Sequence, residues 1–237
     1  MLAVTFALHS FIHYFRNHKI VWNTDNYAAS CILRTGSSKS HLQTLAESVF
    51  ERCKRNNIDF KVKWIPREYI SFADRISKQI DHDDWEITSS YFIYLNNLWG
   101  PFTIDLFADD GNAKVERFYS KFHCPGTSGV NAFLYSWAKE ENFIVPPVYL
   151  VPQVLQHMKW YNTRGVLVTP FWKSAAFYPM IVTNDGNFRP FVREVLYVDG
   201  HVCTSQGKNK DVFIGSPLFK NQMMAIKLDF SYASHNS

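Results

Sequence analysis

The sequence predicts an α/β protein in two parts, each built around parallel strands joined by a helix. Segments with helical spacing of apolar residues alternate along the chain with short apolar or alternating runs. Hydrophobic residues make up 46% of the 237 residues, which suffices for a buried core and excludes wholesale disorder. Charge is uneven, with 12 Lys and Arg against 6 Asp and Glu over residues 1–80, a net −3 over 81–182 and a net +1 over 183–237.

The first part is predicted to begin with a helix, a strand and a second helix. Apolar residues at helical spacing indicate an amphipathic helix over 4–15. A short apolar strand follows at 20–22. Ser40 is suited to cap the next helix, which the Asn56-Asn57 pair ends.

A second strand and a third helix complete this part. Over 60–64, apolar residues alternate with Lys61 and Lys63, which indicates a strand with one charged face. A helix is predicted from about Ser71. Two strands joined by a helix lie parallel in a right-handed crossover.

Two carboxylates follow these two strands. Asp25 comes directly after the first strand, and Asp74 comes shortly after the second. Because ligands bind at the carboxyl ends of strands in open α/β sheets, we expect these side chains to lie near each other. An isolated Asp after a strand is also common in ordinary turns.

The second part repeats the strand–helix–strand pattern. Strands are predicted at 102–107, with Asp105 near the end, at 143–145 and at 165–168, and a helix is predicted over 150–158. Beyond Thr183 the chain shows only short β-like runs, at 191–198 and 211–214.

The predicted domain organisation has four segments. They are a first domain at 1–80, an acidic linker at 81–84, a second domain at 85–182 and an unassigned tail with β-like runs at 183–237. His82 lies among three Asp residues of this linker, a composition that could bind a metal ion. We expect a solvated acidic linker instead, because nothing orients these side chains.

Three segments of the first part carry a family resemblance. Thr24-Asp25-Asn26, the run 64–68 and Ala73-Asp74-Arg75-Ile76-Ser77-Lys78 resemble the C-terminal part of a type 1 ribonuclease H joined to reverse transcriptase, as in DIRS-type retrotransposon polyproteins. The resemblance implies a ribonuclease H-like βαβ unit. It also implies Mg²⁺ as cofactor, an RNA–DNA hybrid as partner and an upstream reverse transcriptase in a parent polyprotein.

The resemblance assigns roles to individual residues. Asp25 and Asp74 correspond to the third and fourth of the family's four metal-binding, catalytic carboxylates, and Asn26 to a position beside the substrate backbone. The cations that could follow phosphates are Lys61, Lys63 and Arg67. A solvated strand face explains the same cations nearly as well.

The match departs from the family at the first two carboxylates. The family's Glu would fall just before Met1, and its first Asp lies on a strand further upstream. Two carboxylates leave too few ligands for two metal ions. We therefore expect a truncated ribonuclease H-like unit that does not cleave RNA by itself.

The second part carries a separate resemblance. It is carried by residues 99–108, Asn131-Ala132-Phe133 and Val145-Pro146-Pro147-Val148. They resemble the region that follows ribonuclease H in DIRS-type polyproteins, which is similar to phage-type DNA adenine methyltransferases of the Dam family. Those enzymes hold the flipped adenine with an Asn or Asp and an aromatic ring around Pro-Pro. Val145 and Val148 stand at those positions here, and Tyr149 comes one residue late.

The valines at the base-binding positions also bear on whether this part binds a cofactor. Asp105 could approach S-adenosylmethionine, although capping a strand explains it equally well. We expect neither S-adenosylmethionine binding nor methyl transfer, so the second part is a degenerate methyltransferase-like domain.

Two function classes remain open. One is a retrotransposon-derived ribonuclease H-like fragment that is inactive alone, and the other is a non-catalytic nucleic-acid-binding or interaction module. Four widely spaced cysteines indicate neither a zinc site nor a disulfide framework. No apolar run approaches the roughly 18 residues of a membrane span. We expect no membrane partner and an intracellular, cytoplasmic or nuclear location.

Overall fold

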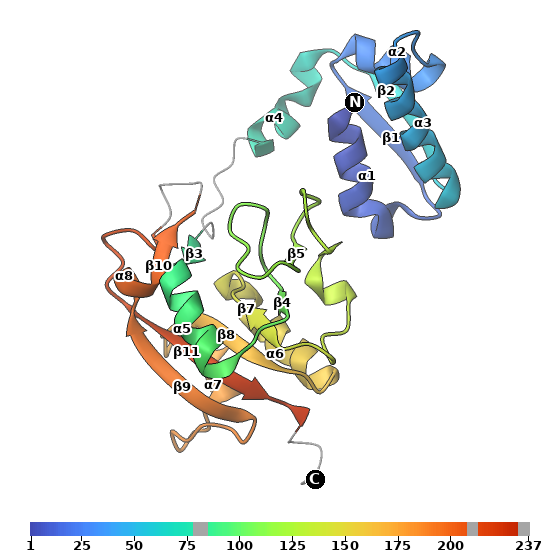
Figure 1. Ribbon diagram of the computed structural model, residues 1–237. Helices are drawn as coiled ribbons and strands as arrows, with labels where there is room; N and C mark the ends of the chain where they lie inside the picture. Colours follow the sequence, from blue (N-terminus) through green and yellow to red (C-terminus); the bar gives the residue numbers. More distant parts are fainter. Residues whose placement is uncertain (78–84, 208–212, 232–237) are drawn as a thin grey trace. The chain divides into compact units, whose positions relative to one another are not determined.

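In the computed structural model the chain forms two units, Met1–Gln79 and Ile80–Ser237 (Figure 1). The structure describes residues 1–77, 85–207 and 213–231, with the side chains of Asp74 and Ser77 left out. Both units mix helices and strands, so the α/β class is confirmed. The predicted linker at 81–84 lies outside the described residues.

Unit 1 (Met1–Gln79) is a two-stranded parallel sheet with helices. The pairing of β1 with β2 is parallel, as the crossover rule predicts. Helix α2 was not predicted, and the signal for it is Asn26, whose side chain accepts a hydrogen bond from the Ala29 amide at 2.9 Å. The elements are α1 (Leu2–Phe15), β1 (Lys19–Thr24), α2 (Tyr27–Thr35), α3 (Ser40–Arg55), β2 (Asp59–Trp64), the 3₁₀ turn η1 (Arg67–Ile70) and α4 (Ser71–Ser77).

The core of unit 1 lies between the sheet and the helices α1 and α3. Leu8 of α1 and Val49 of α3 are buried there. Alternate residues of the strands, among them Ile20 and Phe60, pack against this cluster. On the opposite face of the sheet, the residues at the intervening positions are exposed, and none of the described residues forms a comparable cluster over them.

Unit 2 (Ile80–Ser237) is organised by a five-stranded sheet in the order β4-β7-β8-β11-β9. The strands β4, β7 and β8 are mutually parallel, and β11 is antiparallel to both of its neighbours. These five strands are β4 (Ile104–Asp105), β7 (Asn142–Ile144), β8 (Arg164–Pro170), β9 (Val192–Asp199) and β11 (Gln222–Asp229).

Two short strand pairs and several helices complete unit 2. The pairs are β3 with β10, which is antiparallel, and β5 with β6, which is parallel. Their bounds, and those of the helices and 3₁₀ turns, are β3 (Trp85–Ile87), α5 (Ser89–Trp99), β5 (Tyr119–Ser120), β6 (Gly129–Val130), η2 (Ala132–Leu134), η3 (Val148–Leu150), α6 (Val151–Trp160), α7 (Tyr178–Ile181), α8 (Gly200–Cys203) and β10 (Thr204–Gln206).

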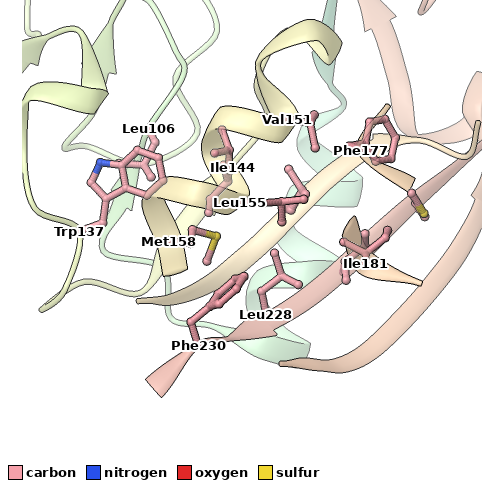
Figure 2. Packing of buried hydrophobic residues seen from close by; sticks show 14 of the residues in the cluster. Leu106, Trp137, Ile144, Val151, Leu155, Met158, Phe177, Ile181, Leu228 and Phe230 are labelled. Carbon is pink, nitrogen blue, oxygen red and sulfur yellow. The ribbon is translucent and has the colours of Figure 1, made fainter. Parts of the chain in front are cut away.

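The sheet of unit 2 is buried on both faces. On one face, Leu95 of α5 packs with Val166, Val168 and Ala225. On the other, α6 covers Leu167 and Ile226. Figure 2 shows this second cluster, with Leu155 and Met158 of α6 near Leu228 and Phe230. A sheet covered on both faces explains why β8 reads as a nearly continuous apolar run rather than as an alternating one.

The structure corrects two sequence predictions in the last third of the chain. The boundary predicted at residue 182 divides the sheet, since β11 pairs with β8 and β9 pairs with β11. Of the strand-like run at 211–214, residues 211 and 212 lie outside the described part, and Phe213 and Ile214 lie in a bend and a turn. The reason is that the partner of β8 and β9 is β11, which begins only at Gln222.

Two further observations concern the class of protein. Among the described residues, no helix is both long enough and apolar enough to cross a membrane. The four cysteines, Cys31, Cys53, Cys124 and Cys203, form no disulfide in the structure.

The two leucines of α5 offer a test of this packing. Leu95 has 0% of its surface exposed and Leu98 has 48%. We predict that Leu95→Ala lowers the free energy of unfolding by about 2–5 kcal/mol, because it leaves a cavity against the sheet. Leu98→Ala on the same helix should cost less than about 1 kcal/mol. Urea unfolding followed by circular dichroism measures both, and equal losses would contradict the placement of α5.

Candidate functional site

The carboxyl edge of β1 and β2 holds the first candidate site. Asp25 lies in the bend directly after β1, and it is exposed. The indole N–H of Trp64, at the end of β2, donates a hydrogen bond to the carbonyl oxygen of Asp25 at 3.0 Å. The rings of Tyr27 and Trp64 meet edge to face with centroids 6.2 Å apart. The two strand ends are therefore held together beside Asp25.

Of the two carboxylates predicted at this edge, the structure describes the side chain of Asp25 only. Asp74 lies in α4, and its side chain falls outside the described part. Among the side chains that the structure describes, no three His, Cys, Asp or Glu residues are grouped so as to hold a metal ion. The described residues therefore do not supply the ligands that a pair of Mg²⁺ ions requires. Asn26 is engaged as the cap of α2 rather than directed at a ligand.

The uncovered face of the β1–β2 sheet carries the predicted cations. In the parallel register, Lys61 lies beside Val21 and Lys63 lies beside Asn23. Both lysines are exposed. At the other end of the face, Lys19 lies 4.0 Å from the carboxylate of Asp59. The half of the face nearest the carboxyl edge is thus cationic, without a described acidic partner on the paired strand.

Arg67 does not belong to this face. It begins η1, beyond the end of β2, and it is exposed there. Trp64, Ile65 and Pro66 separate it from Lys63. The lysine pair is therefore built by the strand, and Arg67 is placed by the following turn.

The carboxyl edge of β4 and β7 in unit 2 holds the second candidate site. Asp105 ends β4 and is 3% exposed. One of its carboxylate oxygens accepts a hydrogen bond from the Lys114 amide at 3.1 Å. The amide of Phe107 also donates to this carboxylate. The carboxylate thus accepts hydrogen bonds from amides of its own loop, as expected if Asp105 caps the strand.

Burial has an electrostatic effect at Asp105. It disfavours the charged carboxylate and raises the pKa of Asp105 to about 6, against the opposing effect of the two backbone amides and the Lys114 charge. A carboxyl that titrates near neutral pH can in principle exchange a proton. The exposure of only 3% leaves little room for a ligand to reach it.

Lys114 and Glu86 extend this site and were not singled out from the sequence. The Lys114 ammonium lies 3.0 Å from the Glu86 carboxylate, and both side chains are largely buried. Ser205 donates a second hydrogen bond to Glu86 at 3.3 Å. The turn residues Asp109 to Asn112 were a local signal that the chain folds back after β4. The partner Glu86 could not be inferred because β3 lies far away in sequence.

The Val145-Pro146-Pro147-Val148 segment follows β7, the neighbour of β4. Val145 and Val148 pack against the hydrophobic clusters on the faces of the sheet. Tyr149, in η3, is 63% exposed. The positions that would hold an adenine in an active methyltransferase are thus occupied by partly buried valines that pack against the core clusters.

Comparisons with known proteins give one partial similarity. Over 57 residues the chain is 35% identical to a protein of Escherichia coli (strain K12) described as "Putative methyltransferase YfdM". That stretch is 24% of this chain and 55% of the other protein, so the chain spans about half the length of the curated relative it matches. No protein-family model matches the chain. The similarity supports a methyltransferase resemblance in general terms, and the ribonuclease H and retrotransposon resemblances stay predictions.

The raised pKa of Asp105 predicts how the free energy of unfolding changes with pH. The folded chain holds this proton up to about pH 6, whereas the unfolded chain releases it near pH 4. The group therefore stabilises the fold below about pH 4, and this contribution of up to about 3 kcal/mol is lost as the pH rises through 6. We predict that Asp105→Asn removes this component from the pH dependence of urea unfolding between pH 4 and 7.

The matched control is Asp110→Asn, an exposed position in the same loop. It should leave the pH dependence as in the wild type. An Asp105→Asn variant with a wild-type pH profile would mean that Asp105 is not the buried, satisfied carboxyl described above.

Proposed function

We propose that this chain binds nucleic acid without cleaving or methylating it. The observation that carries the proposal is the uncovered sheet face of unit 1, on which Lys61 and Lys63 are exposed side by side with Val21 and Asn23. Parallel sheets are normally covered on both faces, so an open face with cations calls for a partner. The phosphates of a nucleic acid fit this face, because lysines bind them independently of the base sequence.

The ligand class follows from the family resemblance of unit 1. We propose a ribonuclease H-like unit, on the grounds of its parallel β1–β2 crossover and of Asp25 at the carboxyl edge. An RNA–DNA hybrid is accordingly the first duplex to test. Mg²⁺-dependent hydrolysis is not part of the proposal, since the described ligands at that edge do not fit two metal ions.

Unit 2 is proposed to be a methyltransferase-related domain that has lost its base-binding positions. The similarity of 57 residues of the chain to a protein described as a putative methyltransferase supports such a relationship for part of the chain. The presence of Val145 and Val148, partly buried against the core clusters, supports the loss, because neither side chain can accept a hydrogen bond from adenine or stack on it. The burial of Asp105 under its own loop supports the absence of S-adenosylmethionine binding.

A second candidate function is the ribonuclease activity of the parent family. Asp25 favours it, being exposed after β1 where a substrate can reach it. In this alternative the chain is a retrotransposon-derived fragment that needs further carboxylates from another polypeptide. The two candidates agree on the ligand and differ in whether the RNA strand is cut.

Replacement of the lysine pair tests the binding proposal. We predict that Lys61→Ala with Lys63→Ala weakens binding of an RNA–DNA hybrid. The slope of log affinity against log salt concentration should fall in magnitude by about 2, because each lysine releases about one counterion from the hybrid. Fluorescence anisotropy at several salt concentrations measures both quantities.

The control removes the same charge from a different surface. Lys39→Ala with Lys54→Ala changes two exposed lysines at the ends of α3. This variant should keep nearly the wild-type salt slope. If the two double variants behave alike, the β1–β2 face is not the binding surface and the proposal fails.

Incubation of the hybrid with Mg²⁺ separates the two candidate functions. We predict that the chain leaves the RNA strand intact while binding the hybrid, and that Asp25→Asn changes neither result. Denaturing electrophoresis of labelled RNA provides the measurement. Mg²⁺-dependent cleavage that Asp25→Asn abolishes would establish the ribonuclease instead.

A further inference from the structure

Two aromatic side chains are exposed together at the carboxyl edge of unit 1. Trp64 is the last residue of β2, and Tyr27 is the first residue of α2, which begins at the same end of the sheet (Figure 1). Trp64 is 44% exposed and Tyr27 is 67% exposed. Single exposed apolar residues are common on proteins, but two aromatic rings in contact with each other form a surface.

Trp64 is exposed at a position where the rest of the strand is covered. Phe60 and Val62 lie on the same face of β2 at steps of two, and both are half-buried. Phe60 packs against the core cluster that α1 and α3 form. Trp64 is not part of that cluster, so its ring lies beyond the cover that the helices provide.

The neighbours of Trp64 hold its ring in place. The indole N–H donates a hydrogen bond to the carbonyl of Asp25 at 3.0 Å, and the ring meets that of Tyr27 at an angle of 84°. The Ile65 amide donates to the carbonyl of Thr24 at 3.0 Å, which keeps the chain after β2 beside the end of β1. A ring fixed in this way loses little side-chain entropy when a ligand stacks on it.

The chemistry around the two rings favours a nucleobase as the ligand. Because its N–H is already bonded, Trp64 offers a ligand its aromatic surface. Asp25, which accepts that bond through its carbonyl, is exposed, and its carboxylate repels phosphates but accepts hydrogen bonds from the N–H groups of a base. A purely apolar partner would instead remove this carboxylate from water without a hydrogen bond, at a cost in free energy.

Cations for the phosphates of the same strand lie close by in the sequence. Lys63 immediately precedes Trp64 and is exposed on the open face of the sheet, and Arg67 is exposed three residues after Trp64. Cations beside exposed aromatic rings are the combination that binds single-stranded nucleic acid, because the backbone follows the charges while the bases stack on the rings.

We propose that Trp64, with Tyr27 beside it, is a stacking site for an unpaired nucleobase. Bases inside a duplex are stacked on each other, so the ligand of unit 1 includes a single-stranded segment. This inference rests on the proposed binding of nucleic acid by unit 1 and specifies the ligand further. An RNA–DNA hybrid with a single-stranded extension should bind more tightly than a blunt one.

Three hybrids that differ only at one end provide the first test. The first is blunt, the second carries a short deoxyadenosine extension, and the third carries an abasic extension of equal length, which keeps the phosphates but has no bases. We expect the deoxyadenosine extension to bind about tenfold more tightly than the abasic one, because stacking on an aromatic ring contributes strongly for each base. Fluorescence anisotropy with the full chain measures the affinities. Equal affinities for the two extensions would overturn the proposal.

Substitutions at the ring provide the second test, read as the ratio of the affinities for the deoxyadenosine and abasic extensions. Trp64→Ala should bring this ratio close to one. Trp64→Phe loses the hydrogen bond to Asp25 but keeps a ring that can stack, so it should retain most of the ratio. If Trp64 served only to hold the strand ends through its N–H, both variants would behave alike, and that result would contradict the stacking site.

The matched control is Tyr14→Ala, which removes a 64% exposed aromatic residue from α1 of the same unit and should keep the wild-type ratio. The outcomes also separate the two proposals. Binding of the blunt hybrid that depends on Lys61 and Lys63, without any gain from the bases, would overturn the stacking site and leave the proposed function standing. A wild-type chain that binds none of the three hybrids would overturn both.

Discussion

The pairing of β11 with β8 and β9 is the constraint on which unit 2 depends. β11 comes from the end of the described chain, yet it lies between β8 and β9 and pairs with both. Its side chains enter the hydrophobic clusters on both faces, as Ala225 and Ile226 illustrate. Without it, β9 would have no partner and α5 and α6 would cover a narrower sheet. The carboxyl edge that holds Asp105 is therefore fixed by residues more than a hundred positions away.

Both units contain parallel strands whose carboxyl ends form an edge, but this edge is exposed in unit 1 and covered in unit 2. In unit 1 the carboxyl edge and one sheet face are open, so Asp25, Lys61 and Lys63 are exposed. In unit 2 the corresponding edge is filled by the chain itself, since Lys114 caps Asp105 and valines pack where a base would bind. The proposed binding surface therefore belongs to unit 1, whereas the sheet of unit 2 is packed on both faces by the described residues.

The sequence predicted the elements whose local pattern agrees with their final environment. The alternation around Lys61 and Lys63 predicted β2 and its exposed face, and the crossover rule predicted the parallel pairing. The strand β11 escaped prediction because Gln222-Met223-Met224-Ala225 suits a helix as well, and long-range pairing decides the outcome. Helix α5 escaped because its aromatic and Asn residues are weak helix formers. Asp105 was predicted as an edge residue, whereas its partner loop depends on tertiary packing.

The central claim is that nucleic acid binds the open face of the β1–β2 sheet. Nuclear magnetic resonance of the isotope-labelled chain during titration with an RNA–DNA hybrid tests it most directly. The account predicts that amide shifts change mainly along β1 and β2, around Asn23, Lys61 and Lys63, with α1 and the loop around Asp105 unaffected. Shift changes centred on the Asp105 loop, or none at saturating hybrid, would contradict it.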